Sequence, residues 1–550
     1  MPAASHPIAG NFNVPVPQNE PVNDLSPGSP EAESLRAEIK RLASMTRDIP
    51  MQIGGELIYT EQTQPVVCPH DHALVLGNLS LANESHVRAA IDSALAARES
   101  WSRMPWWERI SIFLRAAELI THKYRDEVNA ATMLNQSKTF HQAEIDGVCE
   151  LADLLRFNAH YAQEIYEKQP VNTQGENNYL DQRGLEGFVL AITPFNFTNI
   201  AGNLPATAAM MGNTVVWKPS EKSAFSTDVI RRIFEEAGLP PGVINTVHGD
   251  GKMVADIALA HPQFAGLAFT GSTQVFRSLW KKAAEHIDDY RSYPRLVGET
   301  GGKNAVIVHR SADPQAVKTG LTRGTFEFQG QKCSAASRAY VARSVWNQMK
   351  DEYVAQIESL QVGDVYEHST FVGALIDEAA FDRLTDAISR AKELDSHTLI
   401  AGGTSDKSKG YFVRPTVFES TDPTAFTFTT EFFGPLVTVY VYDDEKEGAW
   451  EEVLRLADDT SPYGLTCSVY CNDRQALSVA IDLLRDTSGY LAINDKPAGM
   501  SIGKQQFAGA RASGTNDKIG SPLALQRWVS GRFIKENLNP DTDFSYAYMG

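Results

Sequence analysis

The chain has few cysteines, an excess of acidic over basic residues, and no long apolar run. Its 550 residues include only five scattered cysteines, too few for a disulfide framework, which favours a reducing compartment. Asp and Glu total 68 against 50 Lys and Arg, a formal charge of −18 that repels phosphate backbones. No apolar run approaches the roughly 20 residues of a membrane helix. We therefore predict a globular protein without nucleic-acid or membrane partners.

The first 30 residues lack the marks of a targeting signal. They contain seven prolines, and the first basic residue of the chain is Arg36. A secretory signal begins with basic residues followed by an apolar core, and a mitochondrial presequence is rich in arginine. We expect an extended surface arm on a cytoplasmic protein. A mitochondrial matrix protein that had lost its presequence would look the same.

The length suggests about three domains at roughly 100–200 residues each. Apolar residues at helical spacing predict amphipathic helices near 107–123 and 143–163. Cys149 falls on the apolar stripe of the second helix, so we interpret it as a core residue. The polar, glycine-containing stretch 170–187 is typical of an exposed hairpin or flap.

From residue 185 onward, short apolar runs alternate with helical patterns. Strands that alternate with helices predict right-handed crossovers and a parallel sheet, which binds ligands at the carboxyl ends of its strands. A second alternating stretch, from about 303 to 495, predicts a second α/β domain. The expected strands of the first sheet are 187–192, 214–217, 243–247 and 267–269.

Two segments could bind a dinucleotide, although no G-x-G-x-x-G pattern follows a strand. Residues 270–273 (TGST) follow a predicted strand and open a helix, whose free N–H groups and dipole favour a diphosphate. An ordinary helix N-cap that binds no ligand would have the same sequence pattern. Lys218 could bind a ribose hydroxyl, and Glu221 would accept from a 2′-hydroxyl and repel a 2′-phosphate, favouring NAD over NADP. A solvated loop is the alternative.

Three further residues could carry out chemistry. Cys333 follows Gly330 and Lys332, and a helix beginning there would favour the thiolate together with the lysine. Glu299, beside a double glycine, could act as a mobile general base. Asn196, held between aromatic residues, could donate to an oxyanion. Taken singly, each could equally be a core cysteine, a loop glutamate or a turn asparagine.

Taken together and in this order, these segments resemble the aldehyde dehydrogenase superfamily from about residue 50 to 530. Phe276 departs from the family, many of whose members have glycine there. The segments that carry the resemblance are TPFNF (193–197), WKPSE (217–221), FTGST (269–273), ETGGKN (299–304), FQGQKCS (328–334) and EFFGP (431–435).

Other segments are similar to the 1-pyrroline-5-carboxylate dehydrogenase family, the L-glutamate γ-semialdehyde dehydrogenases of proline catabolism. This resemblance implies oxidation of that semialdehyde with NAD. Dehydrogenation of another acidic semialdehyde such as succinate semialdehyde, a cofactor-free thiol esterase, and an inactive structural relative remain alternatives. The segments lie at 19–22, 26–30, 136–138, 291–295, 494–496 and 509–517.

The resemblance also implies roles for individual residues. Cys333 would be the nucleophile, Asn196 and the Cys333 N–H the oxyanion donors, and Glu299 the base that activates water. Residues 497–501 (PAGMS) depart from the family pattern, and Met500 offers a backbone donor but no hydroxyl. No metal is implied. NAD would contact Thr193, Lys218, Ser220, Glu221, Gly271, Ser272, Glu431 and Phe433, and the substrate would contact Phe197, Ser334, Gly499, Met500 and Phe507.

The implied fold is an α/β aldehyde dehydrogenase fold: a Rossmann-like NAD-binding domain, a second α/β catalytic domain and a small β flap for oligomerisation. We expect a homodimer or higher homo-oligomer. Cys68, His70 and His72 would share one face of a strand, as half of a metal site would. The rest of the sequence shows no matching cluster of ligands, so we do not expect a metal there. The expected bounds are 1–45 for the arm and first helix, 46–168 with 188–298 for NAD binding, 169–187 with 510–550 for the flap and tail, and 299–509 for catalysis.

Overall fold

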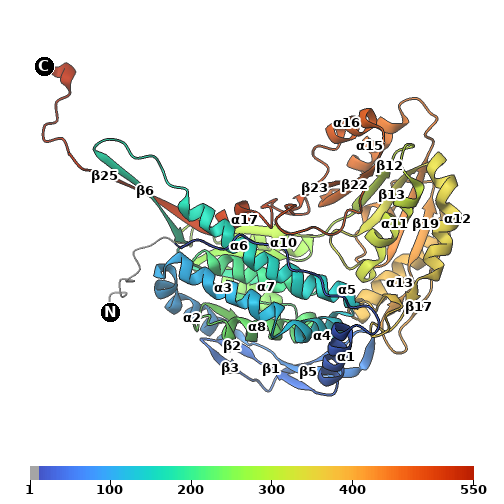
Figure 1. Ribbon diagram of the computed structural model, residues 1–550, viewed down its shortest axis with the longest axis horizontal. Coiled ribbons are helices and arrows are strands. Elements are labelled where there is room, and N and C mark those ends of the chain that lie inside the picture. Colours follow the sequence, from blue (N-terminus) through green and yellow to red (C-terminus); the bar gives the residue numbers. More distant parts are fainter. Residues whose placement is uncertain (1–11) are drawn as a thin grey trace.

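The computed structural model describes residues 12–550 and contains two seven-stranded sheets, each with its own helices (Figure 1). The start of the predicted N-terminal arm, before residue 12, lies outside the described residues. The first sheet has the order β11-β10-β7-β8-β9-β2-β3. Its strands are β7 (Phe188–Ile192), β8 (Thr214–Lys218), β9 (Ile244–Thr246), β10 (Phe264–Thr270), β11 (Arg295–Glu299), and the hairpin of β2 (Met51–Ile53) and β3 (Glu56–Ile58).

In this sheet β7 to β11 are parallel, and their apolar residues are almost all buried between helical layers. After β7 the chain adds β8 and β9 on one side, then returns to add β10 and β11 on the other. The carboxyl ends of β7 and β10 thus flank a topological switch point, where such sheets bind ligands. The packed helices are α2 (Glu84–Arg103), α7 (Thr198–Met210), α8 (Ala224–Glu236), α9 (Gly251–Leu259) and α10 (Thr273–Glu285).

The second sheet has the order β16-β19-β20-β13-β12-β22-β23, and only its edge strand β16 is antiparallel. The predicted α/β fold with two sheets is therefore confirmed. The strands are β12 (Asn304–Val308), β13 (Ala336–Ala342), β16 (His397–Ala401), β19 (Thr416–Ser420), β20 (Leu436–Tyr442), β22 (Thr466–Tyr470) and β23 (Tyr490–Ile493). The helices are α11 (Pro314–Phe326), α12 (Arg343–Ser359), α13 (Glu378–Lys392), α15 (Ala449–Asp459) and α16 (Arg474–Leu483).

A further helical layer covers the first sheet, and the helix predicted near 107–123 is α3 (Trp106–Thr121). The helix predicted near 143–163 is a longer path made of α5 (Phe140–Ala143), a π-helical segment (Glu144–Glu150) and α6 (Leu151–Glu167). Cys149 lies buried in the π-helical segment. The same layer contains α1 (Pro30–Ala43) and α4 (Arg125–Gln136).

A long two-stranded ribbon projects from the body of the molecule (Figure 1). Its strands are β6 (Glu176–Gly184) and β25 (Val529–Asn537), which pair antiparallel over their whole length. A hairpin confined to 170–187 was therefore wrong, because the second strand comes from the C-terminal region. Residues 12–25 have no regular secondary structure and lie alongside α6. There the Asp153 carboxylate accepts hydrogen bonds from the Asn19 side chain and from the Glu20 N–H.

Cys68 and His70 do not share a strand, contrary to prediction. Cys68 ends β4 (Thr63–Cys68) and His70 lies in the turn before β5 (Asp71–Ser80), with 3.2 Å between the Cys68 Sγ and the His70 Nε2. Among residues 12–550, no group of three His, Cys, Asp or Glu side chains is arranged to hold a metal ion. None of the helices in that range has the length and hydropathy to cross a membrane.

Candidate active site

The strand ends of the first sheet bring the predicted cofactor residues to one edge. Thr193 follows β7, Lys218 ends β8, and Gly271 follows β10. The Lys218 Nζ lies 2.6 Å from the Glu221 Oε1, and the Gly249 N–H donates to the same oxygen at 3.1 Å. This fixed Lys–Glu pair combines a donor and an acceptor, the set that vicinal ribose hydroxyls require.

Two serines at this edge cap helices. Ser272 accepts from the Val275 N–H at the start of α10, so the cap interpretation of the TGST segment holds in this structure. The free N–H groups of that first turn remain suited to an anion. Ser220 caps a short 3₁₀ helix (Glu221–Ser223), accepting from the Lys222 N–H. Ser220 thus shapes the loop that holds Glu221.

Phe276 has a structural reason to differ from glycine. Its ring stacks on Phe269 with 5.5 Å between centroids and lies directly over Gly298 of β11. A Cβ at Gly298 would collide with the Phe276 ring. The large side chain of α10 and the small residue of β11 therefore form one packing unit beneath the cofactor edge.

Glu431 and Phe433 approach from the second domain, in the loop before β20. The Glu431 Oε1 accepts from the Gly302 N–H at 2.8 Å, and Phe433 packs edge-on against Phe195. Burial raises the pKa of Glu431 to about 7, opposed by that N–H and by the Lys303 ammonium. The loop therefore places a carboxyl group and an aromatic ring opposite the first sheet.

Two of the three predicted catalytic residues and all the predicted substrate residues share one pocket of about 350 Å³ between the two domains, whereas Asn196 lies behind its wall. Cys333 and Glu299 both line it, at the ends of different sheets. The predicted substrate residues on its wall are Phe197, Ser334, Gly499, Met500 and Phe507.

Cys333 does not begin a helix, so that prediction was wrong. It lies in a turn between a 3₁₀ helix (Glu327–Gly330) and β13. The expected help from Lys332 is also missing, because its ammonium lies 3.1 Å from the Glu327 carboxylate. Burial, reinforced by the Glu431 and Glu299 carboxyls, raises the pKa of Cys333 to about 12. The thiol is thus protonated at rest.

Asn196 lies buried beside the turn that carries Cys333. Its Nδ2 donates to the Gln331 carbonyl at 3.0 Å, two residues before the cysteine. An amide nitrogen carries two hydrogens, so one remains for a ligand. The loop after β7 and the cysteine turn are therefore held together at the point where an oxyanion would form.

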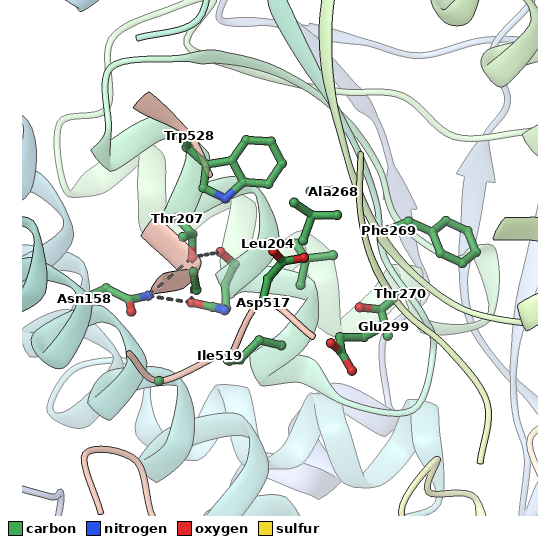
Figure 2. Close-up of a pocket in the computed structure, with 14 residues that line it drawn as sticks. Asn158, Leu204, Thr207, Ala268, Phe269, Thr270, Glu299, Asp517, Ile519 and Trp528 are labelled. Carbon is green, nitrogen blue, oxygen red and sulfur yellow. Dashed lines mark hydrogen bonds between the residues drawn. The ribbon is translucent and has the colours of Figure 1, made fainter. Parts of the chain in front are cut away.

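Glu299 ends β11, and its Oε2 accepts from the Gly509 N–H at 2.8 Å. Burial raises its pKa well above the ordinary value, and the Asp517 carboxylate adds to the effect. Figure 2 shows Glu299 beside a small second cavity, with Asn158 and Thr207 across from it and Trp528 above. The carboxyl group lines both this mostly apolar cavity and the cysteine pocket.

Sequence reasoning missed several charged residues of the main pocket. Glu150 lines it, accepts from the Asn199 Nδ2 at 2.5 Å, and has a pKa raised to about 8 by burial. Lys332 and Lys496 also line it, and both contact Glu327. Glu150 sits inside a helical pattern, so no local signal marked it, and Lys496 belongs to the segment 494–496 that carries the family resemblance but had no role assigned to it.

Comparisons with known proteins agree with this geometry. The model of the aldehyde dehydrogenase family matches residues 58–534. Delta-1-pyrroline-5-carboxylate dehydrogenase of Agaricus bisporus is 45% identical over 97% of this chain and 98% of its own, and the human mitochondrial enzyme of that name is 44% identical over 96% and 94%.

Two solved structures are similar over almost the whole chain. The delta-pyrroline-5-carboxylate dehydrogenase from Mycobacterium tuberculosis bound with NAD has a TM-score of 0.95 and 50% identity, covering 99% of this chain and 100% of its own. The 1-pyrroline-5-carboxylate dehydrogenase from Thermus with bound NAD has a TM-score of 0.88 and 30% identity, covering 96% and 100%. The predicted resemblance is therefore confirmed: the chain belongs to the aldehyde dehydrogenase family, and within it is similar to the delta-1-pyrroline-5-carboxylate dehydrogenases.

Proposed function

We propose that the protein oxidises L-glutamate γ-semialdehyde, in equilibrium with 1-pyrroline-5-carboxylate, to L-glutamate with NAD. The observation that carries this proposal is the shared pocket of Cys333 and Glu299, which also contains charged residues of both signs. The near-full-length relatives with that activity in their names support the substrate.

The residues at the cofactor edge fit NAD. The Lys218–Glu221 pair would hold the adenosine ribose, and Glu221 would repel the 2′-phosphate of NADP. The first turn of α10, after Gly271 and Ser272, would receive the diphosphate. Glu431, whose Oε2 is not the oxygen held by Gly302, would accept from the other ribose. Bound NAD supplies the hydride acceptor of the reaction.

Chemistry would begin when the Cys333 thiol gives its proton to solvent water and the thiolate sulfur adds to the aldehyde carbon. The carbonyl oxygen becomes an oxyanion, which the second hydrogen of the Asn196 amide and the Cys333 N–H stabilise. The pKa of Cys333 is raised in the resting protein, so loss of its proton is part of the activation cost. Asn196 lowers the barrier because its amide is already fixed against Gln331.

After the hydride has left the carbon, a thioester of Cys333 would remain. Glu299 would then take a proton from water, whose oxygen attacks the thioester carbon and releases the acid and the thiol. A buried carboxyl with a raised pKa is a stronger base once ionised, which suits this role. The small cavity beside Glu299 (Figure 2), which has a few polar side chains such as Asn158 and Thr207 on its wall, offers room near the base for water.

The distal end of the substrate carries an ammonium and a carboxylate. Glu150 would face the ammonium, and Lys496 and the Ser334 hydroxyl would face the carboxylate, since all three line the pocket. The N–H groups of Gly499 and Met500 would add donors. Phe197 and Phe507 would cover the aliphatic stem.

We also propose a homodimer or larger homo-oligomer assembled through the β6–β25 ribbon. The ribbon projects from the body, and its Tyr179, Phe533 and Ile534 side chains are exposed. A reducing compartment, the cytoplasm or mitochondrial matrix, suits five cysteines that are all free.

The test is NADH formation with a panel of aldehydes, read by absorbance with NAD and with NADP. We expect the highest kcat/KM with L-glutamate γ-semialdehyde and NAD, and no turnover in Cys333→Ala. A higher kcat/KM with succinate semialdehyde would contradict the substrate assignment. Ester hydrolysis without any NAD binding would contradict the dehydrogenase assignment altogether.

A further inference from the structure

A buried ion pair at the wall of the reaction pocket, where Asp146 is one of the lining residues, has no role in the proposed chemistry. Lys138 and Asp146 are both buried, with 2.5 Å between the Lys138 Nζ and the Asp146 Oδ2. Such a pair pays desolvation for both charges and often adds little net stability. Its contacts reach the two loops that form the reaction centre. We propose that Lys138 and Asp146 are positioning residues that fix Asn196 relative to Cys333.

Asp146 holds the loop after β7 through the start of α7. The N-cap of α7 is Phe197, which has no side-chain group able to cap the helix. Asp146 supplies that cap from the π-helical segment: its Oδ2 accepts from the Thr198 N–H at 2.9 Å and its Oδ1 from the Asn199 N–H at 3.0 Å. The peptide that carries Asn196 and Phe197 is thereby anchored to a rigid element.

Lys138 connects this loop with the cysteine segment. Its Nζ lies 4.2 Å from the centroid of the Phe197 ring and 4.4 Å from that of Phe328. A cation held between two aromatic faces attracts both. Phe197 follows Asn196, and Phe328 lies five residues before Cys333, so one ammonium group touches both sides of the reaction centre.

The cysteine segment needs such support because its backbone is strained. Phe328 and Gln329 both have left-handed backbone conformations, with φ of 51° and 55°. Non-glycine residues adopt that region at a cost and keep it only where their surroundings hold them. Besides the Lys138 contact, the Gln329 side chain donates to the Ser137 carbonyl, next to Lys138, at 2.9 Å.

The consequence concerns the step that forms the oxyanion. A small shift of Asn196 relative to the sulfur would weaken transition-state stabilisation without altering the Lys218–Glu221 pair or the first turn of α10, which follow β8 and β10. This inference rests on the proposed roles of Cys333 and Asn196, but not on the identity of the aldehyde.

The decisive variant is the double substitution Lys138→Met with Asp146→Asn, which removes both charges and leaves neither unpaired. The matched control is Arg125→Met with Glu144→Gln. Glu144 is buried in the same π-helical segment, but its ion pair with Arg125 contacts the N-terminal arm, not α7. A third variant, Phe328→Leu, removes one aromatic face and leaves the ion pair intact.

Three readouts separate positioning from general damage: kcat for aldehyde oxidation, hydrolysis of p-nitrophenyl acetate without NAD, and the KM for NAD. Each rate is normalised to the fraction of folded enzyme by thiol titration. We expect both rates of the double variant to fall about 10- to 100-fold, with the KM for NAD within about twofold. The control should lose thermal stability but keep both rates.

Ester hydrolysis needs the cysteine and the oxyanion donors but neither NAD nor the semialdehyde. An enzyme that hydrolyses the ester yet does not oxidise glutamate semialdehyde would overturn the proposed function and leave this inference standing. Full rates in the double variant would overturn the inference. If that variant does not fold, Phe328→Leu decides: reduced ester hydrolysis supports the positioning role, and an unchanged rate rejects it.

Discussion

The cofactor edge and the reaction pocket are built in different ways. The edge takes Lys218 and Glu221 from the end of β8 and Ser272 from the end of β10, the two strands that flank β7 in one sheet, and its lysine and glutamate balance each other's charge. The pocket takes Cys333 and Glu299 from different sheets and buries both acids, which raises their pKa values. The first region is arranged to bind, whereas in the second region burial disfavours the ionised forms of the groups that would react.

The largest effect should come from Cys333→Ala. Loss of the nucleophile removes covalent catalysis, so we expect kcat to fall by at least about 10⁴-fold. NAD affinity should stay within a few-fold of the wild type, because the binding groups belong to the other region. Isothermal titration with NAD checks this, and a large loss of affinity would show that the two regions are not separate.

The next effect should come from Asn196→Ala. One oxyanion donor typically contributes about 10²–10³ in rate, so we expect that loss in kcat for both aldehyde oxidation and ester hydrolysis. Asn196→Asp is a useful partner variant, since it preserves size but adds a negative charge beside the oxyanion. A loss confined to the KM for the aldehyde would instead make Asn196 a substrate-binding residue.

The same contrast explains what could be predicted from sequence. The central strands β7, β8, β9 and β10 are short apolar runs, and the Lys218–Glu221 pair lies within four residues, so local pattern was sufficient for them. The strands β2, β3 and β11 of the same sheet were not predicted. The turn of Cys333 could not be inferred, because its left-handed Phe328 and Gln329 are imposed by contacts with distant residues such as Ser137.

The family resemblance grouped 169–187 with 510–550 in one flap, but the sequence alone did not give the strands of the ribbon or their pairing, for the same physical reason. β6 and β25 pair across about two-thirds of the chain, and neither sequence indicates which segment completes the sheet. Phe276 appeared only as a departure from the family until Gly298 was seen to lie beneath its ring. Long-range packing determines this strand pairing and the contact between Phe276 and Gly298. Neither can be inferred from the local pattern of a single sequence.

The pH dependence of turnover offers a third test. Cys333 must lose its proton to attack, and Glu299 must be ionised to accept one from water. Burial raises the pKa of both groups, so the rate should increase with pH across the neutral range, by up to about tenfold per unit where one proton is limiting. Rate profiles from pH 6 to 10 check the sign.

Glu299→Gln is the control for that profile. It removes the base for thioester hydrolysis, so the first turnover should still yield NADH while later turnovers slow. A rapid burst of NADH followed by a slow steady state would assign Glu299 to hydrolysis. An equally slow burst would mean that Glu299 also assists the thiol.

A smaller effect should follow from Glu221→Gln at the cofactor edge. The neutral side chain still accepts from a ribose hydroxyl but no longer repels a 2′-phosphate, so we expect the preference for NAD over NADP, as a ratio of kcat/KM values, to narrow by about tenfold. Glu235→Gln, an exposed change on α8, is the charge-matched control. If Glu235→Gln narrowed the preference for NAD over NADP equally, the net charge of the protein, and not Glu221 itself, would determine that preference.

The smallest effect concerns stability, through Glu431. Its pKa is about 7 in the folded protein and about 4.5 in the unfolded chain, so the folded state binds the proton more tightly between those values. The ionisation therefore reduces stability as pH rises from about 4.5 to 7, and the loss is complete above 7. Glu431→Gln should remove this penalty, raising the free energy of unfolding at pH 8 by about 3 kcal/mol at most while raising the KM for NAD. Denaturant unfolding at pH 5 and pH 8 measures the difference. A gain of the same size at both pH values would show that packing, and not the buried charge, limits the folded state there.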